Sequence, residues 1–89
     1  MADFIQDLAD GLAQDVLENS KELGDAFFYE QVSKVIGASS PTLQEAFMTS
    51  IRIRLAEKRG RDFLQKALTA KREGSAMPTA PREAEKGGH

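Results

Sequence analysis

The chain contains no cysteine and no tryptophan, and its only histidine is His89, the last of the 89 residues. Without cysteine it has no thiol nucleophile, no disulfide and no thiolate ligand for a metal. A general base needs a fixed geometry, which a histidine at the end of an unstructured segment cannot provide. We therefore expect a protein that is not an enzyme, with no catalytic residue, no cofactor, no bound metal and no small-molecule substrate.

Long apolar runs are also missing. The longest is the four-residue run 26–29, far short of the roughly 20 residues that cross a bilayer. The chain begins with Asp3 and Asp7 among apolar residues, unlike the basic start of a secretory signal or an Arg-rich transit peptide. These features predict a cytoplasmic protein of bacterial type with no membrane partner.

The small size of the chain limits its core. A domain with about 70 residues able to pack usually gains only about 3–5 kcal/mol from its core, so self-association or a partner protein is expected. Charge is unevenly distributed: residues 1–47 contain nine acids and two bases, whereas residues 48–89 contain ten bases and five acids. This polarity suits antiparallel self-association or pairing of helices, and it could also steer an anion to the second half.

Apolar residues recur at helical spacing along the first 73 residues. In the first predicted helix, residues 3–22, they form one arc, and the helix should end near Gly24. That arc consists of Phe4, Ile5, Leu8, Ala9, Leu12, Ala13 and Val16. The second predicted helix, residues 26–36, has Asp25 as its N-cap and stops at Gly37. Its buried side consists of Phe28, Val32, Val35 and Ile36, with Phe27 off this stripe.

The third predicted helix, residues 41–59, has the clearest start signal. Ser40 can cap it, Pro41 suits its first position, and Thr42 with Glu45 offers an overlapping capping box. Its buried row consists of Leu43, Phe47, Ile51 and Leu55. The alternation over residues 51–55 also matches a strand, but we expect a helix because the capped start leads directly into it.

Gly60 indicates a kink or break, followed by a final helix over residues 61–72. The segment 74–89 is rich in Gly, Pro, Ala and charge, and it lacks the apolar residues that would repay its ordering entropy. The predicted fold is therefore an all-α bundle of three to four helices, with a single helical domain at 1–73 and a disordered tail at 74–89.

Residues 29–48 resemble the helix-turn-helix pattern of small bacterial regulators. Val32 and Ile36 match its apolar anchors, Gly37 its turn glycine, and Thr42 the start of its recognition helix, while Ser33 departs from the usual alanine. The resemblance implies DNA-contacting residues in the major groove or near a phosphate. These are Thr42, Gln44, Glu45, Met48 and Arg52.

The two interpretations differ in which side of the third helix is buried. A helix-turn-helix would bury Leu43, Ala46 and Ile53, whereas a simple bundle would bury the row that contains Phe47 and Ile51. The second set is larger and more apolar, and the first two helices are too acidic to favour phosphate contacts. We therefore favour the bundle over the DNA-binding motif.

In a bundle, Phe27 and Ile53 are surplus apolar residues and become candidates for a partner or dimer surface, together with Arg52 and Arg59. The sequence thus predicts a small regulatory or adaptor protein that acts by helix-mediated binding to another protein or to itself. The alternative is a DNA-binding transcriptional regulator that uses residues 31–52. A more remote alternative is a small accessory subunit of a larger enzyme.

Overall fold

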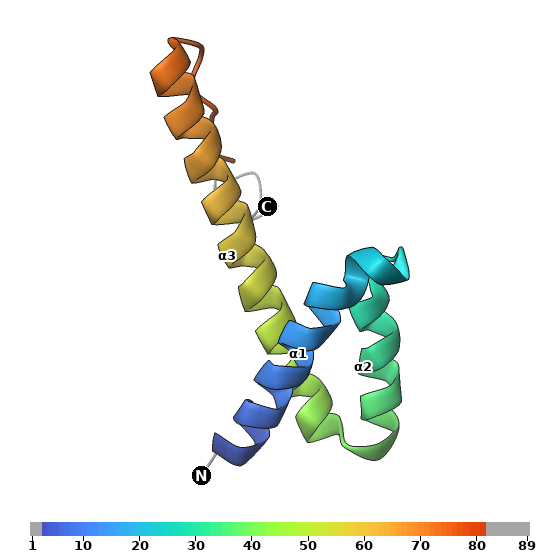
Figure 1. The fold of residues 1–89 in the computed structure, drawn as a ribbon. Coiled ribbons are helices and arrows are strands. Elements are labelled where there is room, and N and C mark those ends of the chain that lie inside the picture. The colour runs from blue at the N-terminus through green and yellow to red at the C-terminus, as the bar shows by residue number, and fades with distance from the viewer. Residues whose placement is uncertain (1–2, 82–89) are drawn as a thin grey trace. The chain divides into compact units, whose positions relative to one another are not determined.

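In the computed structural model, which describes residues 3–81, the side chain of Asp3 excepted, three helices account for nearly all regular structure. They are α1 (Asp3–Leu23), α2 (Phe28–Ser39) and α3 (Pro41–Glu73), and no strand occurs within the described residues (Figure 1). The all-α prediction is confirmed. The chain divides into two units, Met1–Leu55 and Ala56–His89, with the boundary inside α3. The single domain expected over residues 1–73 stays a prediction.

The core of the first unit lies where α1 meets the beginning of α3. Ala9 and Ala13 of α1 are fully buried, as are Phe47 and Ile51 of α3. The two large side chains of α3 pack with these alanines in one cluster of buried residues. α2 pairs with α1 as an antiparallel hairpin and adds half-buried apolar side chains to the same cluster (Figure 1).

The predicted end of the first helix is confirmed. Gly24 has φ of 71°, the left-handed conformation that glycine adopts without strain. The amide of Asp25 donates to the carbonyl of Ser20 at 3.1 Å, and that of Gly24 donates to the carbonyl of Lys21 at 3.1 Å. This pair of bonds is a Schellman motif, which satisfies the last carbonyls of α1.

The limits predicted for the second helix were wrong at both ends. α2 begins at Phe28, with Phe27 at the N-cap position. The carboxylate of Asp25 does accept a backbone bond, from the amide of Phe27 at 2.9 Å, but this bond shapes the turn before the helix. At the other end α2 continues through Gly37 to Ser39, because Gly37 keeps a negative φ and the backbone never turns there.

The start of α3 agrees with the prediction, with Ser40 as the residue that caps it. The Ser40 hydroxyl accepts a hydrogen bond from the amide of Leu43 at 3.1 Å, and Pro41 is the first helical residue. Of the kink or break predicted at Gly60, the break is wrong, since α3 runs on without interruption to Glu73. A glycine inside a helix costs only about 1 kcal/mol. Two i, i+4 ion pairs, Glu57–Arg61 and Lys58–Asp62, span it.

One side chain of the buried stripe predicted for α2 lies in solvent, and a serine outside that stripe is buried. Val35 is 73% exposed, so its assignment to the core was wrong, while Ser33 is buried. The other three side chains of the stripe, Phe28, Val32 and Ile36, are half-buried and pack against the core cluster. On α3, Ile51 is fully buried and Ile53 is 63% exposed, which confirms the bundle register.

The second unit contains the remainder of α3 and the residues after it. α3 ends as α1 does: Gly74 has φ of 73°, and the amide of Ser75 donates to the carbonyl of Ala70 at 2.9 Å. Residues 75–81 form no helix or strand, and Pro78 among them is half-buried. The part of the predicted tail at 82–89 lies outside the described residues. Among those described, no helix is long and apolar enough to cross a membrane.

Candidate interaction surfaces

The corner between α2 and α3 contains the residues that resembled a DNA-reading turn. Only Ser40 separates the two helices. The side-chain amide of Gln44 folds back across the corner and donates to the backbone carbonyl of Ser33 at 2.9 Å. A Cβ atom on Gly37 would clash with the side-chain amide of Gln44, so the glycine leaves the space that this side chain occupies. Gly37 therefore serves close packing rather than a turn.

This packing predicts that the effect of Gly37→Ala on stability depends on the residue at position 44. Gly37→Ala should change the free energy of unfolding little. The gain of about 1 kcal/mol in helix propensity is offset when Gln44 is displaced and a hydrogen bond of similar worth is lost. In a Gln44→Ala background, the same substitution should stabilise the protein by about 1 kcal/mol. Urea unfolding of the four proteins measures the coupling. Equal effects of Gly37→Ala in both backgrounds would contradict the contact.

The other residues implied by the helix-turn-helix resemblance are spread over different environments. Thr42, Glu45 and Arg52 are exposed, whereas Met48 is half-buried and packs against the core. Gln44, the side chain suited to reading adenine, is half-buried and already hydrogen-bonded within the protein. The structure therefore brings these residues onto one helix but does not turn them all outward.

Phe27, a candidate from the sequence, lies in the turn between α1 and α2 and is 61% exposed. Its ring packs edge-on against Tyr29, with the ring centroids 6.1 Å apart. Tyr29 is half-buried against the core, and the amide of Phe27 is held by Asp25. The exposed ring is therefore supported at one edge and fixed at its backbone, as a contact residue would need to be.

Ile53, the second apolar candidate, lies beside a polar cluster that joins α1 to α3. The Ser50 hydroxyl accepts a hydrogen bond from Nε of Arg54 at 3.1 Å and donates to the carboxylate of Asp10. The amide of Gln6 donates to the same carboxylate at 3.0 Å. These bonds, that of Ser50 first, hold the pKa of Asp10 below its usual value, and the positive charge of Arg54 contributes.

The four polar residues and Ile53 line an open hollow of about 280 Å³. Ser50 is 5% exposed, yet sequence patterning did not indicate it, because an isolated serine in an amphipathic helix carries no signal of burial. The residues that could have suggested it are Asp10 and Arg54, whose opposite charges complement each other across the α1–α3 contact. Ile53 thus borders a fixed, charged rim while remaining 63% exposed.

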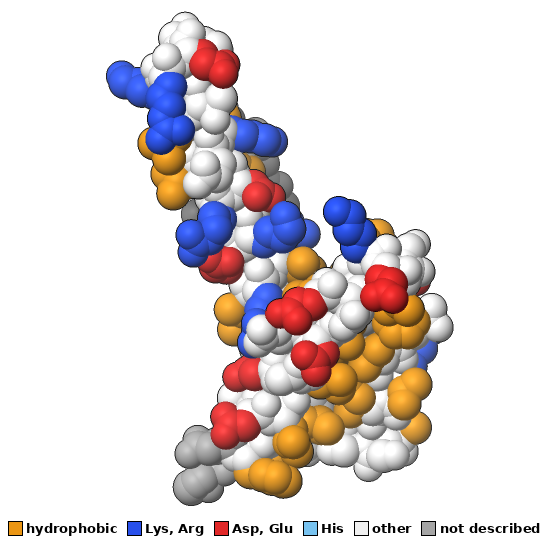
Figure 2. Space-filling view, viewed as in Figure 1, with side chains coloured by type: hydrophobic (Ala, Val, Ile, Leu, Met, Phe, Trp, Pro, Cys, Tyr) orange, Lys and Arg blue, Asp and Glu red, His pale blue; other side chains and the backbone are white. Residues whose placement is uncertain are grey.

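In the second unit, the surface of α3 is both apolar and basic. Phe63, Leu64 and Leu68 are 38%, 49% and 37% exposed. Residues 56–73 contain six bases and three acids, a net charge of +3. Figure 2 shows basic side chains gathered over this part of α3 and acidic side chains over α1. Arg59, the basic candidate in this unit, is exposed and lies in this segment.

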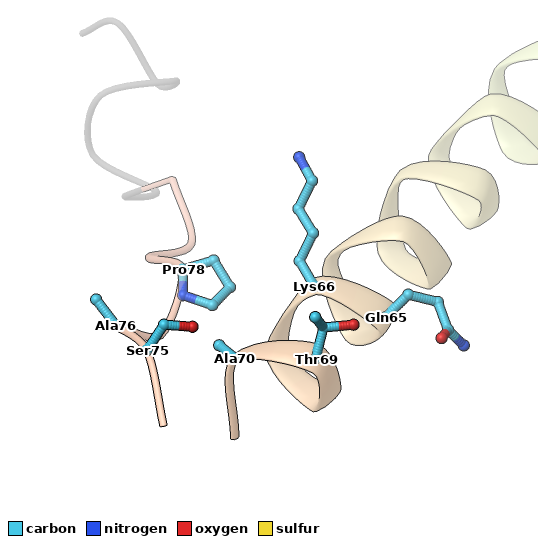
Figure 3. A pocket seen from close by; sticks show the side chains of 7 residues that line it. All are labelled: Gln65, Lys66, Thr69, Ala70, Ser75, Ala76 and Pro78. Atoms are coloured by element: carbon cyan, nitrogen blue, oxygen red, sulfur yellow. The ribbon is translucent and has the colours of Figure 1, made fainter. Parts of the chain in front are cut away.

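Residues 75–81 pack back along one side of α3 within the same unit. Ala70 is 6% exposed, and it lines an open hollow of about 420 Å³ together with Pro78 and Lys66 (Figure 3). The polar side chains of its lining, which are Gln65, Lys66, Thr69 and Ser75, are all exposed. This hollow lacks the converging polar groups that fix a small ligand.

No chemically reactive cluster stands out in the part of the chain that the structure describes. Within it, no three His, Cys, Asp or Glu side chains are grouped so as to hold a metal ion. Comparison with protein-family models, curated proteins and solved structures finds no match to this chain. The function must therefore be inferred from the surfaces themselves.

Proposed function

We propose that this protein is a non-enzymatic adaptor or regulatory protein that acts by binding another protein chain through exposed helix faces. The observation that carries the proposal is the exposure of large apolar side chains in the helices and in the turn between α1 and α2. Ile53 is 63% exposed and Phe27 is 61% exposed in the first unit, and Leu64 is 49% exposed in the second. Burying such side chains is favourable, and interfaces place apolar anchors inside charged rims.

The charged residues around these anchors are consistent with a protein partner. Arg52 and Arg54 flank Ile53 in sequence, and Arg54 is held by Ser50. An arginine fixed by a hydrogen bond loses less rotamer entropy when it makes a further contact. An apolar anchor beside such arginines matches the composition of interface cores and their rims.

DNA binding through residues 31–52 receives less support. Gln44 is engaged with Ser33, and residues 1–47 carry a net charge of −7, whereas phosphate contacts normally dominate affinity for DNA. Tight binding of mixed duplex DNA at low salt, with a steep loss of affinity as salt rises, would contradict the proposal of a protein partner.

Photo-crosslinking tests the proposal. A photoreactive phenylalanine analogue is placed singly at Phe27, Ile53 and Leu64, with exposed Gln31 on α2 as the matched control. Each purified variant is irradiated in a lysate of the native host, and adducts are identified by mass spectrometry. We expect one defined protein adduct at one or more of the apolar positions and none at Gln31. Absence of adducts at all three apolar positions would contradict the proposal.

A further inference from the structure

The exposed face of α1 carries a short line of residues with coiled-coil spacing. Phe4, Leu8, Gly11 and Asp15 follow one another at intervals of four, three and four residues, the spacing that keeps side chains along one seam of a helix. Phe4 is 70% exposed and Leu8 is 49% exposed, while Gly11 and Asp15 are also on the surface. α1 carries six acids and one lysine, so this apolar line lies on a helix of net charge −5.

The basic part of α3 carries a second line with the same spacing. Gly60, Leu64, Ala67 and Lys71 again follow at intervals of four, three and four residues. Leu64 is 49% exposed, Gly60 and Lys71 are exposed, and Ala67 is half-buried. Nothing lies within 4 Å of a Cβ atom placed on Gly60 or on Gly11, so both glycine positions leave open space on the surface.

The two lines complement each other when they are aligned in parallel. Phe4 then faces the open position of Gly60, and Leu8 faces Leu64. Asp15 faces Lys71 at the charged end. Gly11 faces Ala67, two small residues that let the helices approach, so no step of the seam brings together two large side chains without space or two like charges. Pairing this part of α3 with its own copy would instead bring together two segments of charge +3, which is unfavourable.

We propose that the partner is a second copy of this chain, with the α1 line Phe4–Leu8–Gly11–Asp15 of one copy packed against the α3 line Gly60–Leu64–Ala67–Lys71 of the other. The proposal rests on the proposed function and names its partner. The contact is heterologous, because different surfaces of the two copies meet. A closed dimer contains it twice, and an open arrangement would extend into longer assemblies.

Charge exchange within one chain tests the contact. Asp15→Lys and Lys71→Glu each place like charges at the end of the seam, so each should weaken self-association about tenfold at low salt. The double variant restores an attractive pair, since residue 15 of one copy meets residue 71 of the other. Its affinity should return to within about threefold of the unmodified chain. Sedimentation velocity across a concentration series at low salt measures each dissociation constant.

Matched controls distinguish the loss of this contact from a general effect of net charge on self-association. Glu30→Lys on α2 makes the same charge change as Asp15→Lys, and Arg72→Glu makes the same change as Lys71→Glu at the same helix end. Both residues are exposed and lie off the two lines. The controls should alter self-association by no more than about threefold. Circular dichroism checks that every variant keeps the helix content of the unmodified chain.

Two results would overturn the second-copy proposal: a monomeric mass at every concentration, or a double variant no stronger than the single ones. The photo-crosslinking experiment then decides the broader function. An adduct at Leu64 with a different protein would leave the proposed function standing and assign the basic line to that partner. Absence of adducts at all apolar positions would remove both proposals.

Discussion

Ile51→Ala is expected to lower the free energy of unfolding by about 2–5 kcal/mol, whereas Ile53→Ala should change it by no more than about 0.5 kcal/mol. The two residues have the same side chain and lie two positions apart, which places them about 200° apart around the helix. Ile51 is fully buried against α1, and Ile53 is 63% exposed. Urea unfolding, followed by the circular dichroism of the helices, measures the free energy of unfolding of the two variants under identical conditions.

The expected loss at Ile51 is large compared with the total stability of so small a core, which is usually about 3–5 kcal/mol. The Ile51→Ala protein should therefore be substantially unfolded at about 25 °C. Self-association must be kept constant between the proteins, so the measurement belongs at low protein concentration. Equal losses at both positions, or a larger loss at Ile53, would mean that α3 is rotated towards the register of a helix-turn-helix.

The sequence was sufficient to predict the register of α3, because that helix presents one strongly apolar row. Leu43, Phe47, Ile51 and Leu55 recur at four-residue intervals, and burial of this row outweighs any alternative face. The end of α1 was equally predictable, since Gly24 takes the left-handed conformation that a helix end favours. Periodicity and end signals thus located the first unit's core without any tertiary information.

The same signals failed where tertiary contact decided the outcome. Gly37 carries the sequence signature of a helix stop, yet it remains helical, and the side chain of Gln44 occupies the space beside it. Gly60 carries a similar signature, and α3 passes through it. A position can require glycine because its φ is positive or because a neighbouring group approaches the backbone closely, and the sequence alone does not show which reason applies. At Gly37, only the folded position of the Gln44 side chain shows that close approach is the reason.

The candidate surfaces show a comparable limit. Phe27 and Ile53 were identified because they fall off the apolar stripes of their helices, and both side chains are exposed. The sequence does not indicate the exposure of Phe4 and Leu8, because both belong to the apolar arc of α1. That arc is wider than the surface that α2 and α3 cover, so its margin stays in solvent. Periodicity predicts which side of a helix is apolar, but the neighbouring helices decide how much of it is buried.

Ala13→Leu is expected to destabilise the protein by about 1–3 kcal/mol through overpacking. Ala13 is fully buried in the cluster that contains Phe47 and Ile51. Leucine adds three carbon atoms inside this fully buried cluster, so the helices must separate or the side chains must leave favoured rotamers. Alanine and leucine have similar helix propensities, and the loss therefore reports packing rather than helix formation.

The matched control for this overpacking is Gln14→Leu, which adds a leucine to the neighbouring exposed position of α1. It removes only an exposed hydrogen bond to Glu18 and should cost less than about 0.5 kcal/mol. A second change, Phe47→Leu, tests the cause, because a smaller side chain across the contact should make Ala13→Leu less costly than in the unmodified chain. Thermal or urea unfolding of the single and double variants gives this coupling. Strict additivity would mean that Ala13 and Phe47 do not share one packed contact.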